Sequence, residues 1–408
     1  MSDLLSRIGA APDDCSKSIV KRSLEAVRAH LGMDVAYVSE IVADTSVFRE
    51  VDAPGLEHLA APGDVRSLEH VYCRHILEGR LPELIPDTAA FPLAVSMPIT
   101  RMVPIGAHVS VPIRRAGGEL YGMFCCLSAG ARPSLNERDL HIVRAFAGLV
   151  AEEIERDALR SEQRAAKRAT VERALAPGAI AIHLQPICDL RGGHALGYEA
   201  LARFPFEPRR GPDAWFAEAA EVGLGVELEC AAIAAALALL PLLPADATLS
   251  LNASPATVTS GALDALFDAV APDRLVLEVT EHANVDDYDA LCADLARLRA
   301  RGVRLAVDDA GAGFSGLRHI LRLRPDLIKL DISLIRDIDT DPARRALAGA
   351  MQGFARQTGA VLVAEGVETT SERGALLALG FQRGQGYLLG RPAPWGEQAE
   401  TGRLRAAG

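Results

Sequence analysis

The sequence predicts two domains, an α+β domain followed by an α/β domain with a TIM-barrel-like (β/α)8 fold. Three observations carry this prediction. The chain has 408 residues, which is enough for two domains with substantial cores. Its first third combines a helix, strand-like segments and a closing helix, which is typical of an α+β domain. From residue 180 onward, eight short apolar segments alternate with helical stretches, as in a (β/α)8 barrel.

Composition limits the classes of function. The chain has 43 basic and 54 acidic residues, so its formal net charge is −11. Direct nucleic-acid binding is not expected, because such binding needs a basic surface. The longest apolar run, Ala231 to Ala245, is shorter than the roughly 20 residues of a membrane span, so no membrane insertion is expected. Met1 to Cys15 lacks a hydrophobic signal core, and the seven cysteines are scattered. This predicts a reduced, cytoplasmic protein.

The first predicted element is a helix with Val20, Leu24, Val27 and Leu31 on one face and Gly32 as its C-terminal cap. Strands are expected at Asp34–Ile41, His108–Ile113 and Leu120–Leu127. The segment between the last two contains Gly117–Gly118, which favours a hairpin.

A long polar helix is predicted over residues 134–176, overlapping the end of the first domain. Ser134 and Glu137 fit a capping box. Val143, Phe146, Val150 and Ile154 form one apolar stripe. This stripe has two interpretations. Either the helix packs on its own domain, or it pairs with its copy in a homodimer and connects the two domains.

Eight barrel strands are predicted in the second domain. They are Ile180–Leu184, Gly197–Ala202, Ala247–Leu251, Arg274–Val279, Val303–Val307, Leu327–Leu330, Ala360–Ala364 and Gly384–Leu388. A helix is expected at Asp286–Ala300, with Gly302 just beyond its end.

Polar residues recur in or just after seven of these strands. They are Glu199, Asn252, Glu278 with Glu281, Asp308 with Asp309, Lys329 with Asp331, Glu365 with Glu368, and Gln385. A single charged residue in an apolar segment usually forms a salt bridge. The repetition favours one shared site at the C-terminal mouth of the barrel, where such enzymes place their catalytic groups.

The chemistry of these side chains favours divalent cations. Several carboxylates cannot all be ionised in one confined site without cations. Their oxygen atoms favour two Mg²⁺ or Mn²⁺ ions over zinc, and a pair of such ions suits phosphodiester hydrolysis. The adjacent Asp308 and Asp309 could bridge the ions, and Lys329 could orient or deprotonate the attacking water.

An ordered series of motifs covers slightly more than half of the chain. It comprises Gln185-Pro186-Ile187, Tyr198-Glu199-Ala200-Leu201-Ala202-Arg203, Leu251-Asn252-Ala253-Ser254-Pro255, Glu278-Val279-Thr280-Glu281, Asp308-Asp309, Ile328-Lys329-Leu330-Asp331, Ala364-Glu365-Gly366-Val367-Glu368 and Gln385-Gly386-Tyr387. This series resembles the EAL family of bacterial cyclic di-GMP phosphodiesterases. The resemblance implies an EAL domain over residues 177–400 that hydrolyses cyclic di-GMP to linear pGpG.

The resemblance also implies roles for individual residues. One metal would be held by Glu199, Asn252, Glu278 and Asp308, and the other by Asp308, Asp309 and Glu365. The implied catalytic set is Lys329, Glu199, Asp308, Asp309, Asp331 and Glu368. The implied substrate contacts are Gln185, Leu201, Arg203 and Gln385. Glu281 would anchor the loop after the fifth strand. The alternative to an enzyme is a catalytically silent receptor that binds cyclic di-GMP and signals through the connecting helix.

Residues 310–316 depart from the family pattern. Ala310 and Ala312 stand where the family has Phe and Thr, in a loop that couples dimerisation to metal binding in the family. The loop is also readable as a Gly-rich turn with Ser315 as a helix cap.

Residues 16–155 resemble a GAF-type sensory domain, through the leading helix, the segment Tyr72-Cys73-Arg74-His75, the hairpin ending Tyr121-Gly122-Met123-Phe124 and the closing helix. The resemblance implies regulation of the second domain by an unidentified signal. Cys73 and His75 suggest a bound cofactor, but a lone Cys is usually a small buried hydrophobe, and a structural role for both is favoured.

Overall fold

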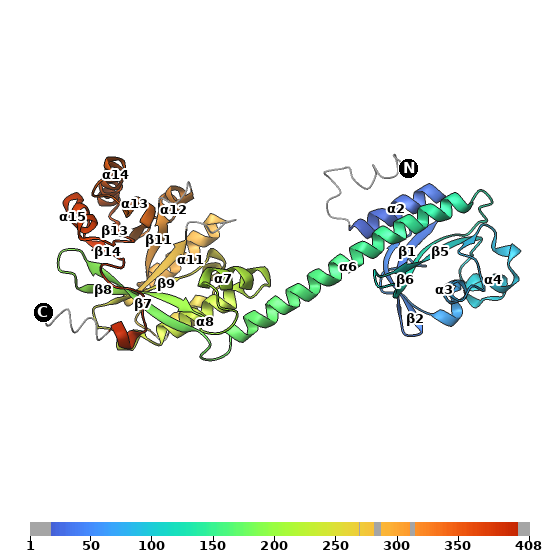
Figure 1. Cartoon of the computed structure of the whole chain (residues 1–408), viewed down its shortest axis with the longest axis horizontal. Helices are drawn as coiled ribbons and strands as arrows, with labels where there is room; N and C mark the ends of the chain where they lie inside the picture. The colour runs from blue at the N-terminus through green and yellow to red at the C-terminus, as the bar shows by residue number, and fades with distance from the viewer. Residues whose placement is uncertain (1–17, 269, 281–286, 311–314, 399–408) are drawn as a thin grey trace. The chain divides into compact units, whose positions relative to one another are not determined.

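The computed structural model describes residues 18–268, 270–280, 287–310 and 315–398. The chain divides into two compact units, residues 1–163 and 164–408 (Figure 1). The predicted Glu281 and the loop residues 311–314 lie outside the described residues.

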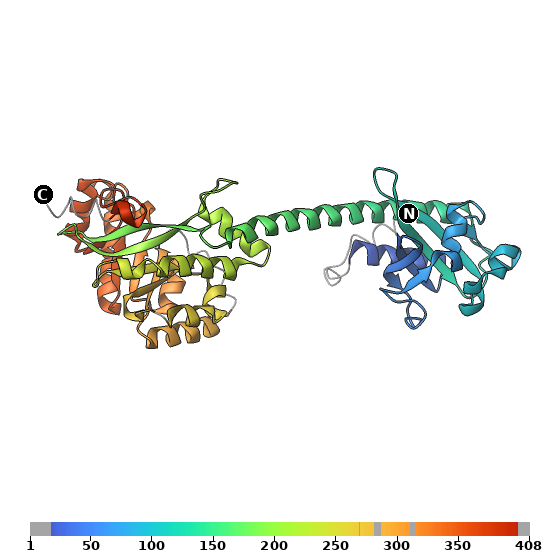
Figure 2. The same ribbon diagram turned by 90° about the horizontal axis from the view of Figure 1, so that it is seen from below.

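The first unit is a six-stranded antiparallel sheet with helices on both faces. The strand order is β3-β2-β1-β6-β5-β4. The strands are β1 (Val35–Val42), β2 (Thr45–Asp52), β3 (Val65–Ser67), β4 (Leu84–Ile85), β5 (Ala107–Arg114) and β6 (Leu120–Ser128). Its helices are α2 (Ile19–Leu31), α3 (Tyr72–Leu77), α4 (Pro92–Ser96) and α5 (Pro98–Met102). Helix α6 (Glu137–Ala174) begins in this unit, and its residues from Arg164 onward belong to the second unit. One core joins the sheet to α2 and α6, and another joins its opposite face to α3 and α4 (Figure 2).

The predicted helix start at Ser134 was wrong. Helix α6 begins at Glu137, and Asn136 caps it, because Oδ1 of Asn136 accepts a hydrogen bond from the Arg138 amide. Asp139 completes the cap by accepting from the Asn136 amide. Asn136 and Asp139 therefore form the N-terminal cap that was predicted for Ser134 and Glu137.

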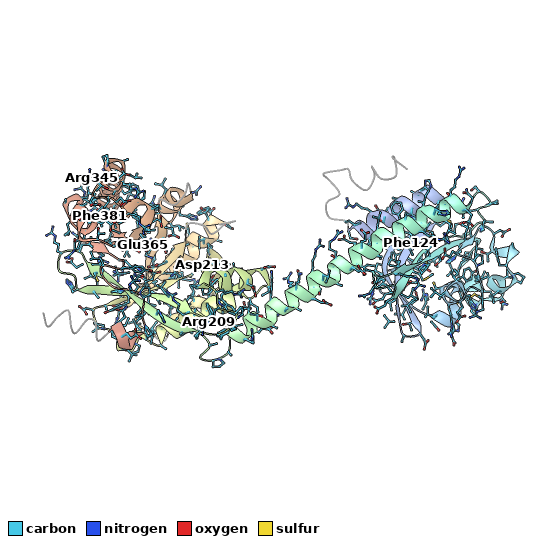
Figure 3. The ribbon with its side chains drawn as sticks, in the orientation of Figure 1. Phe124, Arg209, Asp213, Arg345, Glu365 and Phe381 are labelled. Carbon is cyan, nitrogen blue, oxygen red and sulfur yellow. The ribbon has the colours of Figure 1, made fainter. Side chains whose placement is uncertain are left out.

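The apolar stripe of α6 packs on its own domain. Val143, Phe146 and Val150 are buried in the same core as Phe124 of β6, which is labelled in Figure 3. The homodimer stays a prediction.

The second unit is a closed eight-stranded barrel, which confirms the predicted fold class. Its strands are β7 (Ala181–Asp189), β8 (Ala195–Arg203), β9 (Thr248–Asn252), β10 (Leu275–Thr280), β11 (Arg304–Ala310), β12 (Leu327–Leu330), β13 (Val361–Ala364) and β14 (Arg383–Gly384). Its helices are α7 (Pro212–Glu221), α8 (Gly225–Leu237), α9 (Pro255–Thr259), α10 (Ala262–Phe267), α11 (Tyr288–Ala300), α12 (Ser315–Leu323), α13 (Ile332–Ile335), α14 (Pro342–Thr358) and α15 (Thr370–Leu379). The main core lies between the strands and these helices.

The barrel differs from a regular alternation of strands and helices at its first strand. Strand β7 is antiparallel to both neighbours, β8 and β14. The loop from Leu190 to His194 is too short to hold the crossover that parallel neighbours need. The eighth strand ends at Gly384 rather than Leu388, because the amides of Leu389 and Gly390 donate to the Gly386 carbonyl and form a turn.

One described segment, Gly225–Leu242, is apolar and long enough to cross a membrane, with a mean hydropathy of 1.8. Ile233, Ala236 and Leu237 of this segment pack into the barrel core, and 33% of the segment is buried.

Candidate active site

Two layers of inward-pointing side chains occupy the barrel. The layer nearer the N-terminal ends of the parallel strands is apolar and consists of Ile187, Val276, Ala306, Leu327 and Val363. Alternate residues of a strand face the same side. On the parallel strands, a polar residue follows two positions after each apolar one; these residues are Glu278, Asp308, Lys329 and Glu365. Strand β7 runs in the opposite direction, and there Gln185 lies two positions before Ile187. The strand period therefore gathers these polar groups in one layer at one end of the barrel.

Lys329 is the centre of this polar layer. Its ammonium Nζ lies 2.8 Å from Glu278 Oε2, 2.8 Å from Glu365 Oε1, 3.0 Å from Asp308 Oδ1 and 3.2 Å from Glu199 Oε2. Burial alone would lower the pKa of Lys329, but the surrounding carboxylates raise it well above its ordinary value. The surrounding carboxylates therefore favour the charged form of Lys329.

The carboxylates around Lys329 respond differently to burial. Burial raises the pKa of Glu278 well above its ordinary value and that of Glu365 to about 8. Burial also opposes ionisation of Glu199, but Lys329 and the hydrogen bonds from Gln385 and Asn252 keep the pKa of Glu199 below its ordinary value. One ammonium cannot offset four ionised carboxylates, so Glu278 and Glu365 favour their protonated forms, and a bound cation would favour their ionisation.

Hydrogen bonds hold Glu199 in a fixed orientation. Its Oε1 accepts from Asn252 Nδ2 at 3.1 Å, and its Oε2 accepts from Gln385 Nε2 at 2.6 Å. Because Nδ2 of Asn252 is used in this way, Oδ1 is the amide atom that remains for a cation. Gln385 also donates to Gln185, whose own Nε2 donates to the Gly390 carbonyl.

A bulge in β11 brings two consecutive aspartates to the site. Val307 pairs with Ile328 and Ala310 pairs with Leu330, so Asp308 and Asp309 both stand opposite Lys329. Asp309 has a left-handed φ of 55°. Neighbouring residues of a regular strand face opposite sides, and this strained extra residue places both carboxylates together.

The carboxylates form two groups that could each hold a metal ion. Within each group, one oxygen per residue lies within 4.8 Å of the others. The groups are Glu199, Glu278 and Asp308, and Asp308, Asp309 and Glu365. Asp308 belongs to both. Only oxygen donors are present in these groups, as Mg²⁺ and Mn²⁺ prefer.

Beside these groups lies a pocket with a volume of about 380 Å³. Its lining includes Leu201, Arg203 and Asn252 from the predicted set, together with both aspartates of the bulge. It also includes Asp213 and Phe216 of α7, which the sequence interpretation missed (Figure 3 labels Asp213 and Glu365).

Glu229 of α8 is a further missed residue in the pocket lining. Its Oε2 accepts from the amide and hydroxyl of Ser254, at 2.8 and 2.9 Å, and so fixes the turn after Asn252. Nothing in the strand pattern could indicate which helix residues would reach this turn.

Two further predicted residues, Asp331 and Glu368, follow strands β12 and β13. The Asp331 side chain accepts from the Ser333 amide and caps α13, and Glu368 pairs with Arg336 at 3.3 Å. Neither belongs to the two carboxylate groups, and their catalytic roles stay predictions.

Comparison with known sequences identifies both domains. Residues 168–392 match the family model of the EAL domain, which is more than half of the chain, and residues 17–154 match that of the GAF domain. The chain belongs to the EAL-domain family, and its N-terminal domain is a GAF domain.

Two relatives have names that state an activity. The probable cyclic di-GMP phosphodiesterase PdeA of Escherichia coli (strain K12) is 30% identical over 236 residues, covering 55% of this chain and 32% of PdeA. The bifunctional diguanylate cyclase/cyclic di-GMP phosphodiesterase MucR of Pseudomonas aeruginosa is 32% identical over 237 residues, covering 55% of this chain and 34% of MucR. The matches thus span about a third of each relative's length.

The solved structure of the PaMucR phosphodiesterase in complex with c-di-GMP is 30% identical to this chain, with a TM-score of 0.52. The match covers 57% of this chain and 99% of that structure.

Proposed function

We propose that the barrel domain hydrolyses one phosphodiester bond of cyclic di-GMP and releases linear pGpG. The observation that carries this proposal is the pair of carboxylate groups that share Asp308, next to a pocket that contains Arg203. The names of PdeA and MucR support cyclic di-GMP as the substrate.

In this proposal, two Mg²⁺ or Mn²⁺ ions are held by Glu199, Asn252, Glu278 and Asp308 and by Asp308, Asp309 and Glu365. The oxygen-only donors support this assignment, and so do the raised pKa values of Glu278 and Glu365, which a bound cation would lower. Such ions lower the pKa of a bound water and stabilise the negative charge that develops on phosphate oxygens.

The chain's own residues bind and orient the substrate in this proposal. Arg203, at the pocket wall, is suited to a phosphate because a guanidinium makes paired hydrogen bonds to its oxygens. Phe216 and Leu201 offer apolar surface to a guanine base. Gln385 and Gln185 hold Glu199 in place, and Lys329 positions the attacking water and neutralises nearby charge.

Incubation of the full chain with cyclic di-GMP and Mg²⁺, followed by chromatography, tests the proposal. Formation of pGpG that stops when EDTA is added is the expected result. Binding of cyclic di-GMP without any pGpG would instead favour the silent receptor. Regulation by the GAF domain, homodimer formation and a cytoplasmic location belong to the same proposal.

A further inference from the structure

The N-terminal mouth of the barrel, opposite the polar layer, contains two inward-facing arginines. Arg304 and Arg383 are the first residues of β11 and β14. Arg304 pairs with Val276, and Arg383 pairs with Val363. Both valines belong to the inward-pointing apolar layer. Residues that pair across neighbouring strands face the same side of a sheet, so both arginine side chains project into the barrel. Because β12 and β13 separate β11 from β14, the two arginines approach this mouth from different sides.

Neither arginine has an acidic partner among the described residues. Three arginines that precede Arg304 in the chain, Arg297, Arg299 and Arg301, each pair with an aspartate. By contrast, no ion pair joins Arg304 or Arg383 to a carboxylate within the described part of the chain. The absence of a partner therefore distinguishes these two arginines from their neighbours.

Two acidic side chains near this mouth are already bound to other groups. Asp189, which pairs with Arg383 across β7 and β14, accepts two backbone amides of its own turn. Asp326, which precedes β12, accepts from the Leu305 amide at 2.8 Å and pairs with Arg299 at 2.7 Å. Both carboxylates therefore have other partners, and the positive charge of the arginine pair is not offset by them.

The surroundings of Arg383 disfavour its charge. Burial lowers the pKa of Arg383, and the positive charge of Arg304 lowers it further. An arginine nevertheless keeps its proton in a protein, so the repulsion between the two guanidinium groups persists. Both side chains are only partly buried, and an anion from solution can therefore reach them. Enclosed charges are stable when an opposite charge accompanies them, so this mouth favours a bound anion.

We propose that the N-terminal mouth of the barrel binds a phosphate group between Arg304 and Arg383. Two guanidinium charges match the charge of about −1.5 to −2 that a phosphate monoester carries at neutral pH. A planar guanidinium also makes paired hydrogen bonds to phosphate oxygens. The occupant is either free phosphate or the terminal phosphate of a small molecule. This site lies at the other end of the barrel from the carboxylate groups, and the proposal does not depend on hydrolysis of cyclic di-GMP.

Calorimetric titration of the full chain in EDTA with inorganic phosphate, glycerol 3-phosphate and acetate tests the proposal. EDTA removes metal ions that would bind phosphate at the carboxylate groups. Inorganic phosphate is expected to bind, and acetate, which carries a single charge, is expected to bind more weakly. Binding of glycerol 3-phosphate as well would support a phosphorylated small molecule as the occupant, whereas binding of phosphate alone would support the free ion. A protein that binds no phosphate, or that binds acetate as tightly, would overturn the proposal.

Single substitutions place the phosphate at this mouth. Arg304→Met and Arg383→Met are each expected to weaken phosphate binding at least about tenfold, since each removes hydrogen bonds to a charged group. Arg203→Met changes the pocket at the other end of the barrel and should bind phosphate as the wild type does. Arg297→Met removes one positive charge that is already paired with aspartates, and it serves as the matched control. Wild-type affinity in both Arg304→Met and Arg383→Met, or a tenfold loss in Arg203→Met, would refute the site.

Thermal stability separates a binding role of Arg383 from a structural one. Because Arg304 repels Arg383 and no acid within the described chain pairs with it, Arg383→Met is expected to keep or raise the Tm of the barrel domain in EDTA without phosphate. A residue that merely supports the fold would instead lower the Tm when it is replaced. Circular dichroism during heating measures the Tm of both proteins. A large decrease in Arg383→Met under these conditions would overturn the proposal.

Discussion

Nζ of Lys329 lies 2.8 Å from Oε2 of Glu278, and both side chains are almost fully enclosed in the barrel, with 2% and 1% of their surface exposed. Glu199, Asp308 and Glu365 surround the same ammonium. In the protein without metal, Lys329 thus supplies the positive charge at the centre of this layer.

Lys329→Met is expected to lower the free energy of unfolding of the barrel domain in EDTA by about 3–5 kcal/mol, since it leaves buried carboxylates without their cation. Mg²⁺ should restore part of this loss, because it binds only the folded carboxylate groups. Urea denaturation followed by circular dichroism measures both effects. The control Arg336→Met removes an exposed ion pair with Glu368 and should cost less than about 1 kcal/mol. Equal losses in the two variants would contradict the central role of Lys329.

Glu199→Ala is expected to reduce pGpG formation by at least about 100-fold, because metal ions contribute several kcal/mol to transition-state stabilisation and each factor of ten corresponds to about 1.4 kcal/mol. Chromatographic assay of pGpG gives the rate, and circular dichroism checks the fold. Asp268→Ala, which changes a carboxylate that is 74% exposed, serves as the control. Full activity in Glu199→Ala would refute the metal assignment.

Two substitutions of Asp309 distinguish the effect of backbone strain on stability from the effect of the lost carboxylate on activity. Asp309→Asn should keep the fold stable, since Asn tolerates a left-handed φ, while pGpG formation falls sharply with the lost carboxylate. Asp309→Val should in addition lower the free energy of unfolding by about 1–3 kcal/mol, because a β-branched residue is strained there. Thermal denaturation in EDTA compares the two variants. Identical stabilities would show that the bulge carries no strain.

Glu229→Ala should reduce kcat/KM for cyclic di-GMP about tenfold, because it leaves the amide and hydroxyl of Ser254 without their shared acceptor and frees the turn after Asn252. Steady-state kinetics measures this change. Glu227→Ala, an exposed glutamate on the same helix, should leave kcat/KM unchanged. A similar loss in both variants would assign the effect to the helix rather than to the contact with Ser254.

The sequence was sufficient to predict the barrel and the clustering of its polar residues. Side chains alternate along a strand, and the strand ends meet at one mouth of the barrel, so polar residues at those positions are expected to lie together. Glu278, Lys329 and Glu365 were found in this way. The bulge at Asp309 could not be predicted, because it depends on pairing with β12. Glu229 was missed for a similar reason, since its role depends on where α8 packs.

The antiparallel strand β7 affects how the barrel is made during synthesis. It closes the cylinder against β14, and Leu184 exchanges two backbone hydrogen bonds with Ala393, at 2.8 and 3.1 Å. Partners separated by about two hundred positions must find one another, and such distant pairings form slowly. During synthesis, β7 leaves the ribosome well before β14 and Ala393 do. Until β14 and the residues after it emerge, Glu199 lacks its hydrogen bond from Gln385. The incomplete barrel also exposes unpaired strand edges, which chaperones would have to protect from aggregation.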